Sequence, residues 1–336
     1  MSLINRQQLL KHRPEGAVRS EDFDLVEQPV PDLKEGEVLV RVAYLAMDPT
    51  LRVWMRDIPQ YMPPVAIGEV MRCHGIGRVV QSRSSQFGVG DVVQGMMNWQ
   101  DYVIFPAGDP DFVRLPPEPG IPLPTLIGAC GMSGVTAYYG LTDIAPVSPG
   151  ETLVVSSAAG SVGAVAGQIG KIRGARVVGI AGGPEKCRYI VEELGFDAAV
   201  DYKSENWKES LLKATPDGIH VDFEAVGGEI MHAVMSNMVL GGRVALCGVI
   251  STYEGAKPSD DFSVLIIRRL TVHGFLVGDY KKTNEAVDAL SGWFREGRLK
   301  AQETVAEGLE NAPVVLNRLF DGSHRGKLVL QVDPQA

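Results

Sequence analysis

The sequence has few cysteines, and their placement argues against two kinds of protein. The four of them, Cys73, Cys130, Cys187 and Cys247, have no paired spacing, so neither a disulfide framework nor a structural zinc knuckle is expected. The first residues also lack the basic and apolar regions of a secretory signal peptide. We therefore expect reduced thiols in a cytoplasmic protein.

Positive charge is scarce as well. Against 41 acidic residues there are 32 Lys and Arg, which gives a formal net charge of −9. No basic run is longer than the pairs Arg268-Arg269 and Lys281-Lys282. Binding to nucleic acid or to an anionic membrane surface rests on neutralising phosphate charge, so neither partner is expected.

One uncharged window, Thr152–Gly170, is about as long as a membrane span. This window contains three Ser and four Gly, and it divides into a strand-like half and a helix-like half. A buried βα unit is therefore the better interpretation.

The length of 336 residues exceeds a typical single core and predicts two domains. Residues 1–130 have mostly β character, because short apolar runs are separated there by Gly, Pro and Ser turns. These runs are Val38–Val42, Gly77–Val80, Asp91–Gln94 and Tyr102–Phe105. The proline-rich stretch Pro116–Pro124 marks a connector at the predicted boundary.

After the connector, strand-like and helix-like segments alternate. Strands are predicted at residues 152–157, 176–181, 198–200, 221–224, 243–249 and 271–277, and helices at 162–172, 184–194 and 284–296. The strands are continuously hydrophobic, which is typical of strands covered on both faces. The tail is β-like again at Lys327–Val332, and we expect it to rejoin the first domain.

One glycine-rich turn carries the first functional signal. Ser157-Ala-Ala-Gly160-Ser161-Val162-Gly163 directly follows a predicted strand and begins a predicted helix, the context in which such a motif indicates a dinucleotide site. Gly160 lets the backbone approach a pyrophosphate, and Gly163 lets the helix pack closely on the strand. The helix N-terminus offers unpaired N–H groups to the phosphates. A βα turn without a ligand is the alternative.

The next strand indicates which dinucleotide is bound. An NAD site usually carries Asp or Glu about 20 residues beyond the turn. Here the strand ends in Gly182-Gly183, and Lys186 follows on the next helix, within reach of a 2′-phosphate. This favours NADP. Tyr202, after the third strand, either packs at the adenosine side or donates a hydrogen bond to its phosphate, and a surface aromatic is the alternative.

Metal ligands are not gathered in the way that a zinc dehydrogenase needs. The only adjacent Cys/His pair, Cys73-His74, enters a predicted strand, where neighbouring side chains point to opposite faces and cannot easily share one metal. We interpret both residues as structural. Without a Lewis acid, a Tyr hydroxyl or a ribose hydroxyl of the cofactor is the usual group that stabilises the negative oxygen formed during hydride transfer.

Several stretches together make the chain resemble a known family. They are Met47–Arg52, Gly68–Met71, Gly131–Tyr138, Ala158–Gly163, Cys247–Tyr253, Gly274–Val277 and Glu307–Pro313. The Ile-Ser-Thr-Tyr and Glu-Gly-Leu-Glu-Asn-Ala-Pro segments among them are far more specific than any glycine motif. Over nearly its whole length, the chain resembles the zinc-independent medium-chain dehydrogenase/reductases of the leukotriene B4 dehydrogenase/prostaglandin reductase type, which include curcumin reductases and plant double-bond reductases.

The resemblance implies an α/β fold with two domains. A doubly wound Rossmann domain at residues 130–300 would accompany a mainly β, GroES-like catalytic domain made of residues 1–129 and 301–336. It also implies a homodimer and the NADPH-dependent reduction of the C=C bond of α,β-unsaturated ketones or aldehydes. A quinone reductase of the same fold and a cofactor-binding protein with little turnover are the alternatives that stay open.

Carried over by position, the resemblance also implies the site residues. The cofactor would be bound by Met132, Thr136, Gly160, Ser161, Val162, Gly163, Gly182, Lys186, Tyr202, Val226, Cys247, Gly248, Ile250, Ser251, Tyr253, Phe275, Leu276, Val277, His324 and Gly326. Lys186 and Tyr202 would lie at the 2′-phosphate, and Met132 and Thr136 near the nicotinamide. Tyr253 corresponds to the family tyrosine at the substrate carbonyl, where its O–H would donate to the oxygen that becomes negative.

Three departures from the family pattern concern the cofactor. Ala225 replaces Asn in Glu224-Ala-Val-Gly-Gly228, His324 replaces the Asn of the Gly-x-Asn-x-Gly-Lys pattern, and Ser133 stands where Pro is common. Two amide side chains are thereby lost near the cofactor. Because a His can still donate a hydrogen bond, we expect binding to survive. We interpret His324 as structural, with a catalytic acid as the alternative.

Overall fold

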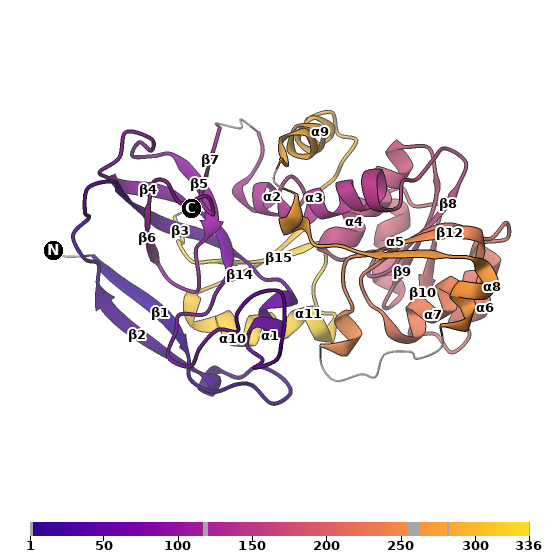
Figure 1. The fold of residues 1–336 in the computed structure, drawn as a ribbon, viewed down its shortest axis with the longest axis horizontal. Coiled ribbons are helices and arrows are strands. Elements are labelled where there is room, and N and C mark those ends of the chain that lie inside the picture. The colour runs from indigo at the N-terminus through magenta and orange to yellow at the C-terminus, as the bar shows by residue number, and fades with distance from the viewer. Residues whose placement is uncertain (1–2, 117–119, 254–261, 281, 336) are drawn as a thin grey trace. The chain divides into compact units, whose positions relative to one another are not determined.

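The computed structural model describes residues 3–116, 120–253, 262–280 and 282–335 (Figure 1). The chain forms two compact units. The first contains the residues up to Ile127, Glu303–His324 and the residues from Leu328 onward; the second contains Gly128–Gln302 and Arg325–Lys327. Both ends of the chain therefore belong to the first unit.

The first unit is mainly β. Its larger sheet has the order β14-β15-β3-β4-β5-β7, with β6 paired to β3, while β1 and β2 form a separate antiparallel pair. The strands are β1 (Ile4–Leu10), β2 (Phe23–Pro29), β3 (Glu37–Ala46), β4 (His74–Ser82), β5 (Val92–Met96), β6 (Tyr102–Pro106), β7 (Val113–Leu115), β14 (Glu303–Glu307) and β15 (Lys327–Gln331). The short helices are η1 (Ser20–Asp22), α1 (Thr50–Trp54), α2 (Leu123–Ile127), η5 (Leu309–Asn311), α10 (Ala312–Leu316) and α11 (Arg318–Asp321).

The C-terminal strand confirms the predicted return of the tail. β15 runs antiparallel to β3, with Val329 opposite Ala46. Leu328 and Leu330 are buried in the same apolar core as Val40 of β3. The last strand thus completes the core that the first hundred residues begin.

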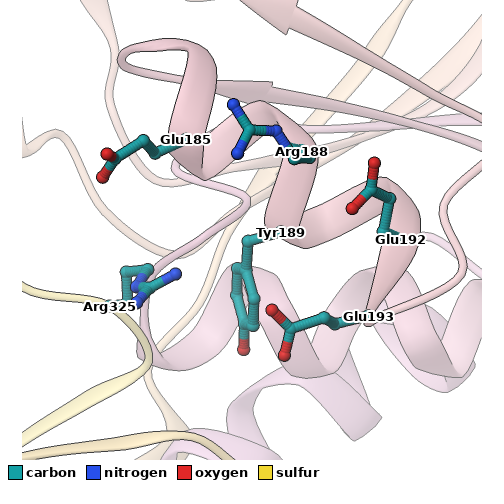
Figure 2. A pocket seen from close by; sticks show the side chains of 6 residues that line it. All are labelled: Glu185, Arg188, Tyr189, Glu192, Glu193 and Arg325. Carbon is teal, nitrogen blue, oxygen red and sulfur yellow. The ribbon is translucent and has the colours of Figure 1, made fainter.

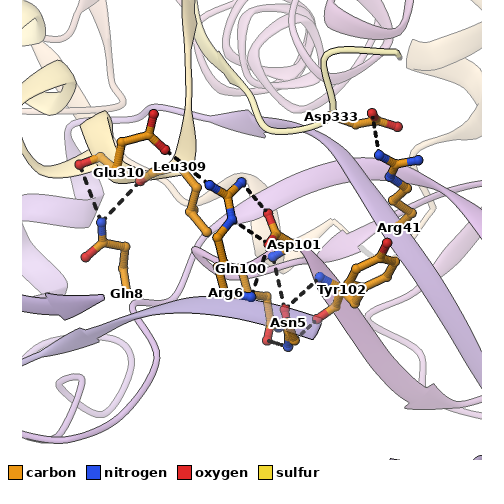
Figure 3. Close-up of polar contacts among 10 residues, drawn as sticks. All are labelled: Asn5, Arg6, Gln8, Arg41, Gln100, Asp101, Tyr102, Leu309, Glu310 and Asp333. Atoms are coloured by element: carbon orange, nitrogen blue, oxygen red, sulfur yellow. Dashed lines mark hydrogen bonds and ion pairs between the residues drawn. The ribbon is translucent and has the colours of Figure 1, made fainter. Parts of the chain in front are cut away.

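Polar contacts also bind β1 to the C-terminal part of this unit (Figure 3). The guanidinium of Arg6 donates to both carboxylate oxygens of Asp101, at 2.8 and 3.0 Å, and lies 3.4 Å from a carboxylate oxygen of Glu310. The side-chain amide of Gln8 donates to the carbonyl oxygen of Leu309 at 3.2 Å. Because Glu310 and Leu309 lie about 300 positions from Arg6 and Gln8 in the sequence, these contacts form only when both chain ends are folded.

The second unit is a parallel α/β sheet of the order β10-β9-β8-β11-β12-β13. The strands are β8 (Thr152–Val155), β9 (Arg176–Ala181), β10 (Ala198–Asp201), β11 (Ile219–Glu224), β12 (Met238–Leu246) and β13 (Thr271–Gly274). The helices are α3 (Met132–Tyr139), η2 (Gly140–Ile144), α4 (Ser161–Ile172), α5 (Pro184–Glu192), α6 (Trp207–Ala214), α7 (Gly228–Ser236), η3 (Ile250–Thr252), α8 (Ser263–Arg268), η4 (Val277–Asp279) and α9 (Asn284–Arg295). This strand order is that of a Rossmann fold, so the predicted fold class is confirmed.

Both faces of this sheet are covered, which explains the continuous hydrophobicity of its strands. Leu153 and Val155 of β8 pack into one apolar cluster with residues of α4 and α9, whereas Val154 packs into another with residues of α6 and α7. Successive side chains of a strand point to opposite faces, so every position of β8 must be apolar or small.

Some element boundaries differ from the predictions. β12 begins at Met238, before the predicted Arg243, because Met238 pairs with Ile219 across a shift in register. β13 ends at Gly274, since the chain turns into η4 shortly after Phe275 donates its N–H to the carbonyl oxygen of Leu246. In the described ranges, no helix has the length and apolar character to cross a bilayer.

Candidate functional site

The strand order of the second unit indicates where on its sheet a ligand binds. Counting from β8, the chain first winds through β9 and β10 and then continues on the other side of β8 with β11. The loops after β8 and β11 therefore leave adjacent strands in opposite directions. In open α/β sheets, ligands bind at this switch point, outside the carboxyl ends of the strands.

The predicted cofactor turn lies at this switch point. Ser157 adopts a positive φ of 49°, Gly160 forms the N-cap of α4, and its N–H bonds the carbonyl oxygen of Ser157 at 2.9 Å. A Cβ on Gly163 would lie 2.4 Å from that same carbonyl oxygen, so a side chain would push the helix off the strand. No side chain caps the first turn of α4. The turn therefore fits a pyrophosphate at a helix N-terminus.

Two residues from other segments, Ser133 and Gly326, form hydrogen bonds with this turn. The hydroxyl of Ser161 donates to the hydroxyl of Ser133 at 2.6 Å, so the serine that departs from the family pattern has a partner in the turn. Gly326 donates its N–H to the carbonyl oxygen of Ala159 at 2.8 Å. At Gly326, φ is +64° and a Cβ would lie 1.8 Å from the carbonyl oxygen of Gln302, so only glycine fits there.

A pocket along α5 shows how the segment before Gly326 is anchored (Figure 2). Its lining residues are Glu185, Arg188, Tyr189, Glu192, Glu193 and Arg325. The guanidinium of Arg325 lies over the ring of Tyr189, 5.5 Å from its centre. Because Arg325 immediately precedes Gly326, this stacking helps to fix the glycine against the cofactor turn.

The tip of β9 has the composition expected of an NADP site. A Cβ on Gly182 would lie 2.9 Å from the ring of Tyr202, so this ring packs on the Gly182 backbone. Lys186 lies in the first turn of α5, whose N-cap is Gly183. The side chain of Lys203 also lies beside Gly182, with its Cε 3.1 Å from the same Cβ position. This lysine was not predicted as a site residue, although it directly follows Tyr202.

The loops after β11 and β12 pack against each other. The N–H of Ile250 donates to the carbonyl oxygen of Ala225 at 3.1 Å, and both the N–H and the hydroxyl of Ser251 donate to that of Val226, at 3.0 and 2.6 Å. A Cβ on Gly248 would lie 3.2 Å from the carbonyl oxygen of Ala225. The backbone around Ala225 is thus fixed without the amide side chain of the family pattern.

A buried carboxyl group beneath these loops was also missed. Glu224, the last residue of β11, is fully buried, and its Oε1 accepts a hydrogen bond from the Ser156 hydroxyl at 2.8 Å. Burial raises the pKa of Glu224, while hydrogen bonds from the backbone N–H groups of Gly227 and Val226 act to lower it. Cys247, at the start of the next loop, donates its thiol to the carbonyl oxygen of Glu224 at 3.3 Å.

The remaining predicted residues of this unit follow β13 or belong to α3. Phe275 is partly buried against the core and packs near Gly140, while Leu276 is 41% exposed and Val277 begins η4. Met132 begins α3, and its carbonyl oxygen accepts the hydroxyl of Thr136 at 2.8 Å.

The predicted catalytic tyrosine and the C-terminal histidine have defined surroundings. Tyr253 follows η3, and its N–H donates to the carbonyl oxygen of Ile250 at 3.1 Å. His324 belongs to the first unit, where its Nδ1 lies 2.7 Å from the carbonyl oxygen of Arg318. This contact fits the structural interpretation of His324.

Candidate metal ligands do not gather in the part of the chain that the structure describes, where no group of three His, Cys, Asp or Glu side chains could hold an ion. The thiol of Cys73 is buried and donates to the carbonyl oxygen of Ala46 at 3.3 Å. The ring of His74 instead lies near that of Trp54, with 6.4 Å between their centres.

Comparison with known proteins agrees with this arrangement. Residues 6–113 match a family described as the N-terminal domain of oxidoreductase, and residues 161–292 one described as zinc-binding dehydrogenase. The chain is 42% identical to the NADPH-dependent curcumin reductase of Escherichia coli (strain K12), covering 98% of this chain and 97% of that protein. It is 36% identical to the 2-alkenal reductase (NADP(+)-dependent) of Nicotiana tabacum, with the same coverage. The crystal structure of CurA in complex with NADPH from Vibrio vulnificus is 38% identical and superposes with a TM-score of 0.92 over 98% of this chain and 99% of that one.

These identities extend over almost the whole of both chains, so they apply to both units. The zinc in the second family's description has no counterpart among the described side chains. The chain therefore belongs to the zinc-independent medium-chain dehydrogenase/reductases, in the family of the prostaglandin, curcumin and 2-alkenal reductases.

Proposed function

We propose that this protein reduces the C=C bond of α,β-unsaturated ketones and aldehydes with NADPH. The observation that carries the proposal is the tip of β9, where Gly182 lies under Tyr202 and Lys186 lies in the first turn of α5, beside a turn that fits a pyrophosphate. The relatives named as an NADPH-dependent curcumin reductase and an NADP-dependent 2-alkenal reductase support the same cofactor and substrate class.

In this proposal, different segments of the second unit bind different parts of NADPH. The turn Gly160–Gly163 and the N–H groups of α4 hold the pyrophosphate, and Lys186 and Tyr202 hold the 2′-phosphate. The loops that carry Val226 and Ser251 form the wall at the switch point. When bound, NADPH supplies the hydride that is added to the β-carbon of the substrate.

In this proposal, Tyr253 acts at the carbonyl oxygen of the substrate. As the hydride reaches the β-carbon, the electrons of the C=C bond move toward the carbonyl and negative charge develops on its oxygen. The phenol O–H of Tyr253 donates to that oxygen and so lowers the barrier. A proton from Tyr253 or from water then adds to the α-carbon, which leaves a saturated ketone or aldehyde.

A substrate panel tests the proposed activity. The protein is mixed with NADPH or NADH and with enones, enals and quinones, and oxidation of the cofactor is followed. We expect turnover with enones and enals and a preference for NADPH. Turnover of quinones alone would identify a quinone reductase instead, and NADPH binding without any turnover would identify a cofactor-binding protein.

Replacing Tyr253 tests the tyrosine's role. Tyr253→Phe removes one hydroxyl, and the loss of a single oxyanion donor typically costs about 10²–10³-fold in turnover. We expect this loss in kcat with nearly unchanged NADPH binding, measured by fluorescence titration. If binding falls as far as turnover, Tyr253 is a cofactor contact and not the donor to the carbonyl oxygen.

We further propose that the protein is a homodimer joined at the open edge of the parallel sheet. β13 is the last strand of that sheet in the described part of the chain, and such an edge invites pairing with a second copy. Large apolar side chains are exposed nearby on α8 and β12, with Ile266 at 81%, Ile267 at 63% and Leu240 at 64%. Apolar surface of this kind is typical of an interface.

The dimer is tested by light scattering coupled to gel filtration. Ile266→Asp places a charge in the proposed interface and should convert the dimer to monomer. Leu212→Asp is the matched control, because Leu212 is also exposed but lies on α6. A wild-type monomer, or an equal effect of both variants, would contradict the proposed interface.

We also propose a cytoplasmic location. All four cysteines lie in the described ranges as thiols rather than in disulfides, which fits a reducing compartment. Fractionation of cells, with detection of the protein by antibody, tests this location.

A further inference from the structure

The carboxyl group of Glu224 accepts hydrogen bonds from two of the loops at the switch point. Its Oε1 accepts hydrogen bonds from the hydroxyl of Ser156 at 2.8 Å, from the N–H of Val226 at 2.5 Å and from the N–H of Gly227 at 2.8 Å. The hydroxyl of Ser156 in turn accepts the N–H of Ala225 at 2.8 Å. One side-chain atom thus ties the loop after β8 to the loop after β11.

The contacts extend to a third loop. Val226, which donates to Glu224, accepts both the N–H and the hydroxyl of Ser251 from the loop after β12. Gly227 and Gly228 have φ values of +75° and +59°, and consecutive glycines of this kind leave a backbone with many accessible conformations. The hydrogen bonds to Glu224 select one of them.

We infer that Glu224 is a positioning residue, whose buried carboxyl group holds the three loops at the switch point in the arrangement that NADPH requires. The inference rests on the proposed function, because that function assigns the cofactor to the switch point. Glu224 itself touches the loops from beneath and does not need to contact the cofactor. Its loss is therefore expected to weaken cofactor binding more than it slows the chemical step.

The same strand offers a matched control. Asp222 lies two residues earlier on β11, so it points to the same face as Glu224, and it is equally buried. Neither of its carboxyl oxygens has a hydrogen-bond partner in the structure. Burial, and then the nearby Glu224, raise the pKa of Asp222 well above its usual value. Asp222 thus shares the burial and chemistry of Glu224 but makes no bond to the loops.

The conservative replacement of Glu224 is also informative. Oε1 makes all the hydrogen bonds to the loops, while Oε2 is buried and has no hydrogen-bond partner. Glutamine can keep its amide oxygen at the Oε1 position and place its nitrogen where Oε2 lies. Glu224→Gln should therefore preserve the loop contacts, whereas Glu224→Ala removes them.

The test compares four variants of the full chain: Glu224→Ala, Glu224→Gln, Ser156→Ala and Asp222→Asn. For each, the Kd for NADPH is measured by fluorescence titration without substrate, and KM and kcat are measured with an enone. Thermal unfolding is recorded in parallel. We expect Glu224→Ala to raise Kd and KM for NADPH roughly tenfold or more, with a smaller change in kcat.

The other variants decide between positioning and mere structural support. Ser156→Ala should raise Kd for NADPH about threefold to tenfold, Glu224→Gln should stay within about threefold of wild type, and Asp222→Asn should leave Kd unchanged. Equal Kd values for folded Glu224→Ala and wild type would overturn the inference, as would an Asp222→Asn effect as large as that of Glu224→Ala. If Glu224→Ala does not fold, an unchanged Kd in Ser156→Ala overturns it.

The Kd measurement also separates this inference from the proposed function. If wild-type protein binds NADPH but reduces no enone or enal, the proposed function fails while the four Kd values still test Glu224. If wild-type protein does not bind NADPH at all, both fail together.

Discussion

A few side chains set the charge at the tip of β9. Asp201 lies close to this tip, but its Oδ1 accepts the backbone N–H groups of Gly183 and Lys203, at 2.8 and 3.0 Å. The Asp201 carboxylate is therefore hydrogen-bonded to the backbone of its own loop and of the loop after β9. Lys186 and Lys203 add positive charge nearby, and a 2′-phosphate is stabilised by positive charge where a ribose hydroxyl gains little.

Removing the lysine on α5 tests this account of cofactor choice. We expect Lys186→Ala to lower kcat/KM for NADPH roughly tenfold and to leave that for NADH nearly unchanged, because only NADPH carries the 2′-phosphate. Steady-state kinetics with both cofactors gives the ratio of kcat/KM for NADPH to kcat/KM for NADH. Lys213→Ala, which removes an exposed lysine from α6, is the control and should not change it. An unchanged ratio in Lys186→Ala would show that this lysine does not contact the phosphate.

At the scale of single residues, a residue's structural role could be predicted from the sequence only where its contacts lie within a few positions. The turn at Gly160 and the close packing at Gly163 could be predicted because both follow from a strand, a turn and a helix within a few positions. The bond between Ser156 and Glu224 joins residues 68 positions apart, and no local pattern indicates it. The same holds for Ser133, whose partner Ser161 lies 28 positions away.

At the scale of elements, close packing explains the glycine in the first turn of α4. A Cβ on Gly163 would lie 2.4 Å from the carbonyl oxygen of Ser157. We expect Gly163→Ala to destabilise the protein by about 1–3 kcal/mol, because helix and strand must move apart. Differential scanning calorimetry measures the effect.

A second glycine provides the control for this prediction. Gly292 lies on α9, and a Cβ there would meet no atom within 4 Å. Gly292→Ala should therefore stabilise the protein by about 0.5–1 kcal/mol, since alanine loses less backbone entropy in a helix. Equal unfolding temperatures for the two variants would contradict this account of the α4 packing.

Helix and strand types were predicted better than their ends. β9 has the predicted bounds, Arg176–Ala181, because its apolar run follows Arg176 and ends at Gly182. The first residues of β12, Met238–Gly242, were not predicted as strand because they include two adjacent glycines, and Leu240 among them is exposed. Their strand conformation depends on pairing with β11 rather than on local hydrophobicity.

At the scale of the whole molecule, the sequence alone indicated alternating elements but not their order in space. The doubly wound Rossmann fold came from the resemblance, and the pairing of β8 with β11 in the structure defines its switch point. The β-like tail was expected to rejoin the first domain, and the structure shows that it does so as β15, paired with β3. Which side chains surround the substrate depends on contacts between residues far apart in the sequence, which no local motif encodes.

The fate of the transferred hydride tests the central claim most directly. The protein is incubated with an acyclic enone and NADPH that carries deuterium at C4 of the nicotinamide, and the product is examined by NMR. We predict a saturated ketone with deuterium on the former β-carbon. Deuterium on the carbonyl carbon of an allylic alcohol, or no incorporation into the enone, would contradict the assignment as a double-bond reductase.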